Sequence, residues 1–212
     1  MKRVRVQRHA DALLVIDVQN DFCRKGSLEI PGGEEVVPAI NELMPHFSHV
    51  ILTQDWHPQS HQSFASAHPG SQPFEVIDCS YGKQTLWPDH CVQGTAGAAF
   101  HPLLLTHPAR LILRKGMSAE IDSYSAFFEN DRTTPTGLSG ALKELGIRRV
   151  FLTGLATDVC VLYTALDARR LGFETVLMED ACRATALEGS EARALKEMSQ
   201  AGVDRSRLHH II

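Results

Sequence analysis

Short apolar runs alternate with helical patterns along most of the chain. Helical spacing, mostly closed by a glycine, covers residues 32–47, 136–146, 158–172 and 188–202. The apolar runs are rich in leucine and β-branched residues without polar alternation, which is typical of strands buried on both faces of a sheet. They occupy residues 12–17, 49–55, 110–116, 149–154 and 174–180, and a sixth strand is expected at residues 207–212.

This order of elements predicts an α/β domain. Alternating strands and helices indicate a parallel sheet with helices on both faces, so we expect a three-layer sandwich with a mostly parallel, about six-stranded sheet. At 212 residues the chain is long enough for one large core and short for two. We therefore expect residues 1–212 to form a single domain.

One long segment interrupts the alternation. Residues 56–108 are rich in Pro, Gly, Ser, His and Gln, contain several aromatic residues, and far exceed the length of an ordinary connection. Long irregular segments inside compact domains are often functional. We expect this segment to carry part of a binding site.

Charge and cysteine content narrow the partners. The net charge of −4 and the scattered Lys and Arg residues leave no attraction for nucleic acid. Five cysteines without a close pairing pattern fit a reducing compartment rather than a disulfide scaffold. The first apolar run is broken by Asp17, and no later segment approaches the length of a membrane span. We expect a cytoplasmic protein with a small-molecule partner and no membrane partner; a homo-oligomer stays open.

Three polar residues follow the predicted strands. Asp17 ends the first strand, Lys115 ends the third, and Cys160 follows the fourth after a turn of small residues. Because the carboxyl ends of parallel strands meet at one edge of a sheet, we expect these side chains to converge. Together they would supply a nucleophile, a proton carrier and a charge stabiliser, the set that covalent acyl transfer requires.

Each of the three also has a structural interpretation. A cysteine is often a core residue, a lysine can extend its ammonium group into water, and an aspartate can cap a loop. The helical spacing predicts a core stripe at Val159, Leu162, Tyr163 and Leu166. Cys160 lies one position off this stripe in the first helical turn, where free amides and the helix dipole favour a thiolate. The combination of residues favours catalysis.

A second group of residues suggests a metal site. Asp55 and His57 flank Trp56, so in an extended segment their side chains point the same way. With His90 they would form a two-histidine, one-carboxylate site with open positions, as catalytic metal sites have. The alternative is chance, since the chain contains eleven histidines. His61 is open as a further ligand, as a hydrogen-bonding neighbour of a ligand, or as an exposed loop residue.

Five separated segments together are similar to a known family. They read LLVIDVQNDFCRKGSLEIPGG, TQDWHPQSHQSFAS, WPDHCVQGTAGAAFHPLL, KGMSAEIDSYSAF and GLATDVCVLYTALDARRLGF. In this order, over about residues 12–185, they resemble the nicotinamidases of the isochorismatase-like cysteine hydrolase superfamily. The resemblance implies an isochorismatase-like fold. It also implies hydrolysis of nicotinamide to nicotinate and ammonia through a thioester, as a step of NAD salvage.

The resemblance also implies roles for individual residues. The catalytic triad falls on Asp17, Lys115 and Cys160, and the ligands of a divalent metal ion fall on Asp55, His57 and His90. Zn²⁺ is the expected ion, although Fe²⁺ and Mn²⁺ accept the same nitrogen and oxygen ligands. A fourth protein ligand occurs in some members, but His61 does not match its register, so that position is left to water.

The same resemblance implies how the substrate is held. A cis peptide between Leu155 and Ala156 would turn the amides of Ala156 and Cys160 towards one point, as an oxyanion hole. Three aromatic residues correspond in position to substrate contacts: Phe22, Trp87 and Tyr124. For each of them the alternative is a place in the aromatic core.

Two other functions stay open. One is a sibling amidase or isochorismatase with another substrate; isochorismatases lack the nucleophilic cysteine, and other cysteine amidases usually lack this metal set. The other is an iron oxygenase or metal-stabilised binding module in which Cys160 is structural. Release of ammonia from nicotinamide separates all three.

Overall fold

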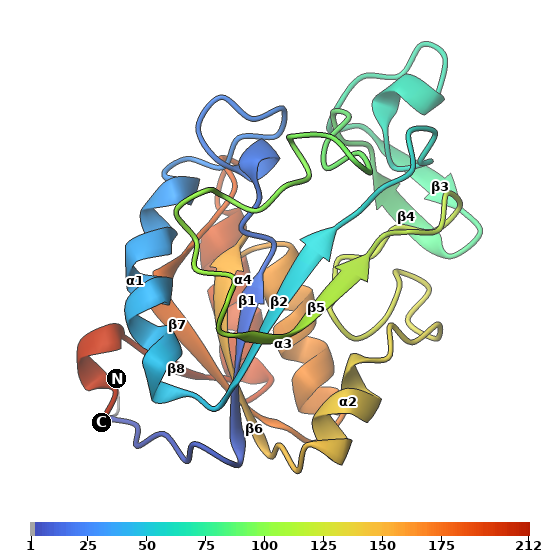
Figure 1. Cartoon of the computed structure of the whole chain (residues 1–212). Helices are drawn as coiled ribbons and strands as arrows, with labels where there is room; N and C mark the ends of the chain where they lie inside the picture. Colours follow the sequence, from blue (N-terminus) through green and yellow to red (C-terminus); the bar gives the residue numbers. More distant parts are fainter. Residues whose placement is uncertain (1–2) are drawn as a thin grey trace.

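A computed structural model describes residues 3–212 and shows one parallel sheet between two layers of helices (Figure 1). The sheet has six strands: β1 (Asp11–Ile16), β2 (His49–Asp55), β5 (Ala109–Lys115), β6 (Arg149–Leu155), β7 (Glu174–Arg183) and β8 (Asp204–Ser206). Their spatial order is β5-β2-β1-β6-β7-β8, and every neighbouring pair is parallel. The predicted α/β sandwich is confirmed.

Alternate residues of β1 point into two separate cores. Leu13 and Val15 join a cluster with helix α1 (Val36–Leu43). Leu14 and Ile16 join a second cluster on the other face of the sheet. That face is covered by α2 (Leu138–Glu144), α3 (Cys160–Arg170) and α4 (Ser190–Gln200). The central strands carry continuous apolar runs, residues 12–16 in β1, 50–52 in β2 and 150–152 in β6, because both faces of the sheet are buried, as the sequence pattern predicts.

Short 3₁₀ helices lie in the connections and near the C-terminus. They are η1 (Asn20–Phe22), η2 (Gly33–Glu35), η3 (Met44–His46), η4 (Ala65–Ala67) and η5 (Leu208–His210). Within residues 3–212, no helix is long and apolar enough to cross a membrane.

The expected position of the sixth strand is wrong. Residues 207–212 do not form a strand: η5 lies there, while β8 pairs with β7 just before it. β8 lies at the edge of the sheet and has the sequence DRS, so it shows no apolar run. Ile211, which suggested a strand, packs instead in the core beside α1 and bridges to Val4.

The opposite edge strand, β5, also departs from expectation. Its residues alternate between partly buried and exposed, and Ile112 is 47% exposed. Only the face of β5 that carries Leu111 and Leu113 packs on the core.

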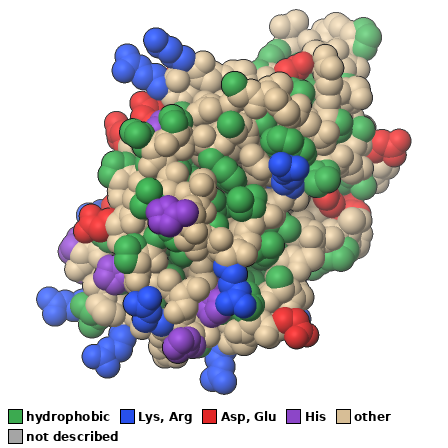
Figure 2. All heavy atoms as spheres, in the orientation of Figure 1, with side chains coloured by type: hydrophobic (Ala, Val, Ile, Leu, Met, Phe, Trp, Pro, Cys, Tyr) green, Lys and Arg blue, Asp and Glu red, His purple; other side chains and the backbone are tan. Residues whose placement is uncertain are grey.

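Figure 2 shows hydrophobic side chains near the centre of the face towards the viewer and most Lys and Arg side chains nearer its periphery.

The core stripe predicted for α3 is confirmed in part. Leu162 is buried, and Val159 and Leu166 are partly buried against the same core cluster, while Tyr163 is only partly buried. The other buried residues of the helix are Cys160, Val161, Thr164, Ala165 and Ala168. The helix also packs against β6 and β7 through small residues such as Ala165 and Ala168, which a search for large apolar side chains does not find.

The long segment, residues 56–108, is folded rather than irregular throughout. It contains η4 and an antiparallel hairpin of β3 (Val76–Cys79) and β4 (Gly82–Thr85). Isolated bridges join His57 to Val92 and Phe64 to Trp87. In Figure 1 the hairpin lies beyond the carboxyl ends of β2 and β5, on the side where a ligand crevice is expected.

Candidate active site

The carboxyl ends of four strands bring together the residues that the sequence pattern selected. Asp17 follows β1, Asp55 ends β2, Lys115 ends β5, and Cys160 begins α3 after β6. β1 lies between β2 and β6, where the order of strands reverses. Such a switch point opens a crevice at the carboxyl edge of the sheet, and the expected convergence is present.

Lys115 is the centre of this group. Its ammonium is fully buried, lies 2.9 Å from Asp17 Oδ2 and 3.5 Å from Cys160 Sγ, and forms an ion pair with Asp55. It also donates to the carbonyl of Ser123 at 2.8 Å. Burial acts to lower its pKa, but Asp17 and Asp55 outweigh burial and raise the pKa well above the ordinary value. The interpretation that this ammonium extends into water is wrong.

Asp17 is a buried carboxylate with an unusual backbone. Its φ is +47°, in the left-handed region, and its Oδ1 accepts a hydrogen bond of 2.6 Å from Thr53 Oγ1. Burial raises the pKa of Asp17 to about 6, although Lys115 opposes the shift. A carboxyl group with a pKa near neutrality can both accept and return a proton.

Cys160 lies at the start of α3 and lines a cavity. Burial raises the pKa of its thiol well above the ordinary value, and the nearby Lys115 only partly offsets this. The net shift disfavours the thiolate that the helix start was expected to favour. A thiol needs a base to become a nucleophile, and Asp17 is a candidate for that base.

The carboxyl end of β6, just before the turn into α3, requires a glycine. Gly154 has a φ of +105°, and a Cβ on it would lie 2.1 Å from the carbonyl oxygen of Ile16. The peptide bond between Leu155 and Ala156, which follows shortly after Gly154, is cis, as expected. The N–H groups of Ala156 and Cys160 donate no hydrogen bond within residues 3–212, and both residues line the cavity.

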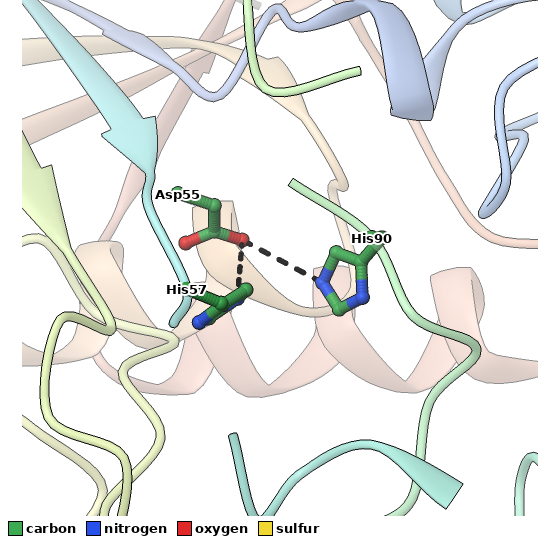
Figure 3. A group of neighbouring side chains, drawn as sticks. All are labelled: Asp55, His57 and His90. Atoms are coloured by element: carbon green, nitrogen blue, oxygen red, sulfur yellow. Dashed lines mark ion pairs between the residues drawn. The ribbon is translucent and has the colours of Figure 1, made fainter. Parts of the chain in front are cut away.

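Asp55, His57 and His90 form a compact group whose ligand atoms lie within 4.8 Å of one another. Figure 3 shows Asp55 Oδ2 facing both imidazoles; its distances to the Nε2 atoms of His57 and His90 are 3.7 and 4.0 Å. His57 Nδ1 lies 2.9 Å from the carbonyl of Gly116, and His90 Nδ1 lies 2.8 Å from that of Pro88. A carbonyl can only accept, so each Nδ1 carries a proton, and in the neutral imidazole each Nε2 then has a free lone pair. Burial acts to lower the pKa of His57, but Asp55 outweighs it and the net shift is upwards.

The charge states of this group suit a cation. Burial and the nearby His57 lower the pKa of His90 to about 4, so its imidazole is neutral. Burial acts to raise the pKa of Asp55, but Lys115 and His57 outweigh it and the net shift is downwards. An ionised carboxylate and a neutral imidazole are the forms that bind metal ions. The donor set therefore fits a divalent metal ion.

His61 lies beside this group and is not an exposed loop residue. It is fully buried, its ring centroid is 4.4 Å from that of His57, and its Nδ1 lies 2.7 Å from Ser63 Oγ. It forms a second close group with His57 and Asp122. Sequence reasoning missed Asp122, which is buried and lines the cavity. Asp122 lies in the segment KGMSAEIDSYSAF, which could have drawn attention to it. It was missed because it does not directly follow a predicted strand.

The cavity above these groups has a volume of about 260 Å³. Phe22, Trp87 and Tyr124 line it together with Cys160 and His90. Its exposed rim includes Phe74 and Leu187. Apolar walls with few polar groups, at this size, suit a small flat molecule. The alternative that the three aromatic residues only fill the core does not agree with their place on the cavity wall.

The chain is similar in sequence to known hydrolases. The model of the isochorismatase domain matches residues 11–208. A nicotinamidase of Acinetobacter baylyi is 50% identical over 201 residues, which are 95% of this chain and 94% of the relative. A nicotinamidase of Escherichia coli is 43% identical over 196 residues, 90% of this chain and 92% of the relative.

Solved structures show the same fold. A nicotinamidase and pyrazinamidase of Acinetobacter baumanii matches with a TM-score of 0.94 at 52% identity, covering 96% of this chain and 99% of that one. PnC1 of L. infantum, in complex with nicotinate, matches with a TM-score of 0.87 at 39% identity, with coverages of 99% and 98%. A pyrazinamidase of Pyrococcus horikoshii, in complex with zinc, matches with a TM-score of 0.75 at 34% identity, with coverages of 93% and 99%. With this fold and these matches, the chain belongs to the isochorismatase domain family.

Proposed function

We propose that this protein is a nicotinamidase that hydrolyses nicotinamide to nicotinate and ammonia. The observation that carries the proposal is the buried group of Asp17, Lys115 and Cys160, which opens into a cavity with aromatic walls. The nicotinamidases among its relatives, and the nicotinate held by the L. infantum structure, support this substrate. A role in NAD salvage follows from the reaction.

The reaction starts at the thiol. Asp17 accepts the proton of Cys160, whose sulfur then attacks the carboxamide carbon, and the N–H groups of Ala156 and Cys160 stabilise the oxyanion. Asp17 returns the proton to the amide nitrogen, the C–N bond breaks, and ammonia leaves a thioester on Cys160. Water, deprotonated by Asp17, attacks the thioester and releases nicotinate and the thiol. Lys115, 2.9 Å from Asp17, stabilises its ionised form throughout.

Asp55, His57 and His90 are proposed to hold one divalent metal ion. The fixed Nδ1 protons of both histidines support this, and the Pyrococcus horikoshii structure with zinc favours Zn²⁺ over Fe²⁺ or Mn²⁺. Such an ion supplies a Lewis-acid position for a ring nitrogen. His61, buried against His57, restricts the space around that imidazole.

The aromatic residues are proposed to hold the substrate ring. Phe22, Trp87 and Tyr124 line the cavity from three separate segments, and the Phe22 ring centroid lies 5.4 Å from that of His90. Ring stacking and edge contacts orient a flat heterocycle at little entropic cost. We further propose that residues 1–212 act as one domain, and that the protein works in a reducing compartment such as the cytoplasm, since all five cysteines are free.

An assay of the purified protein tests the proposal. Incubation with nicotinamide should release ammonia and nicotinate in equal amounts, measured by coupled spectrophotometry and by chromatography. A boiled sample controls for uncatalysed hydrolysis. No product from the folded, metal-loaded wild type would refute the proposed function.

A further inference from the structure

The aromatic walls of the cavity are supported from behind by a buried amide. Gln84, in β4, is fully buried and does not line the cavity. Its Nε2 lies 3.0 Å from the hydroxyl of Tyr124 and 2.9 Å from Oδ2 of Asp122, and both of these residues line the cavity. Trp87 Nε1 donates to the same Tyr124 hydroxyl at 3.1 Å. Two walls from separate segments therefore meet at one hydroxyl, which Gln84 also contacts.

The surroundings of Gln84 allow only one orientation of its amide. Oε1 lies 3.2 Å from both the hydroxyl of Tyr81 and Nδ2 of Asn130, which can donate to it. Nε2 lies 2.7 Å from the carbonyl of Thr85, in addition to the Asp122 carboxylate. A flipped amide would set its oxygen against two groups that only accept. The fixed amide therefore restricts where its hydrogen-bond partners can lie.

These contacts connect distant parts of the chain. Gln84 belongs to the hairpin of the long segment, whereas Tyr124 and Asn130 follow β5. Asn130 completes the connection, since its Oδ1 accepts from the Tyr124 backbone N–H at 3.0 Å. Buried polar groups that lose a partner are costly, so the network favours one arrangement of the walls.

We propose that Gln84 is a positioning residue that sets the placement of Trp87 and Tyr124, and thereby the fit of a flat aromatic amide between them. The identity of that amide rests on the proposed function; the placement of the walls does not. Among residues 3–212, no hydrogen bond joins Gln84 to Asp17, Lys115 or Cys160. Its loss should therefore weaken substrate binding more than the chemical step.

Steady-state kinetics test the first consequence. Gln84→Met keeps the length of the side chain and removes its hydrogen bonds. KM for nicotinamide should rise at least about fivefold while kcat changes less than about twofold, since a lost buried hydrogen bond costs about 1 kcal/mol. Tyr81→Phe is the matched control: it removes one contact to Oε1 and leaves both Nε2 contacts to cavity residues. It should leave KM near the wild-type value.

Fluorescence tests the placement of the wall directly. The chain has two tryptophans, so in a Trp56→Phe background the emission comes from Trp87 alone. Trp87 is only 6% exposed, and acrylamide should quench it weakly in the parent. Gln84→Met should increase this quenching, and Tyr81→Phe should not.

The outcomes separate positioning from a purely structural role. If acrylamide quenching of Trp87 is the same in Gln84→Met as in the parent, the proposal is overturned. This holds if KM is also unchanged, and it holds if kcat and the melting temperature fall together. If Gln84→Met does not fold, the same measurements are made on Gln84→Glu. This variant keeps the side-chain volume and the acceptor oxygen but loses the donor. If the wild type does not hydrolyse nicotinamide, the proposed function fails, while the quenching comparison still decides the role of Gln84.

Discussion

At the scale of single residues, Cys160 is proposed to supply the attacking atom. Its replacement by alanine removes one sulfur at the start of α3 and leaves Asp55, His57 and His90 in place. Cys160→Ala should abolish turnover, because the thioester cannot form, while the melting temperature and the bound metal stay near those of the wild type. Ammonia release, thermal melting and metal analysis check this. Ammonia release at close to the wild-type rate would remove Cys160 from the mechanism.

Lys115 is paired with two buried carboxylates, so we expect its loss to lower both stability and activity. Lys115→Met leaves Asp17 and Asp55 without their cation. Breaking a buried ion pair typically costs about 3–5 kcal/mol, so the variant should melt at a lower temperature. The pKa of Asp17 should rise further, and kcat/KM should fall at least about 100-fold as the base becomes protonated.

A surface lysine provides the comparison. Lys83 pairs with Asp78 on the hairpin, with both side chains exposed, so Lys83→Met should leave kcat/KM within about twofold. A change in a surface charge can also alter kcat/KM by up to about tenfold. If Lys115→Met loses less than that, Lys115 does not act in the site.

At the scale of elements, the turn from β6 into α3 depends on Gly154. Gly154→Ala would bring a Cβ within 2.1 Å of the Ile16 carbonyl and force a φ of +105° on an alanine. The variant should lose more than about 2 kcal/mol of unfolding free energy, because β1 and β6 must separate to make room. Denaturant unfolding measures the loss.

Gly140, inside α2, is the matched control. A Cβ at Gly140 would meet nothing within 4 Å, and its φ is not in the left-handed region. Gly140→Ala should therefore be neutral or stabilise the protein by up to about 1 kcal/mol, as helix propensity predicts. An equal loss of unfolding free energy in both variants would contradict the assignment of strain to the β6–α3 turn.

At the scale of the whole molecule, the proposed catalytic residues and the proposed metal ligands lie side by side. The first set is Asp17, Lys115 and Cys160, and the second is Asp55, His57 and His90. Chelation, or His57→Ala, should remove bound metal and weaken nicotinamide binding, because the ligand set of Asp55, His57 and His90 is lost. Cys160 should still react with a small alkylating reagent, since Asp17 and Lys115 remain. Metal analysis, binding and alkylation rates are the measurements.

Benzamide extends this test to the substrate. It keeps the carboxamide but carries C–H in place of the ring nitrogen, so kcat/KM should strongly favour nicotinamide for the metal-loaded enzyme and much less so for the stripped enzyme. Equal turnover of both amides by the loaded enzyme would show that the ring nitrogen is not recognised. The substrate would then be another amide, within the cysteine amidase class.

Several features of the molecule were determined by the local sequence. The central strands and the four helices lie where the sequence pattern predicts them, because strands buried on both faces of a sheet need continuous apolar runs and helices show a 3.6-residue period. The convergence of Asp17, Lys115 and Cys160 followed from parallel topology alone, since strand ends share one edge. Their chemical roles, and those of the metal ligands, stay predictions that the variants above test.

Other features were decided only by the tertiary structure. β8 is only three residues long and has the sequence DRS, so no apolar run marks it, and its position depends on pairing with β7. The burial of His61 beside His57, and the contacts of Gln84 with Asp122, arise where the long segment folds back over the sheet. Gln84 and Asp122 are 38 positions apart, and both contacts depend on how the long segment folds, which no periodic pattern along the chain records.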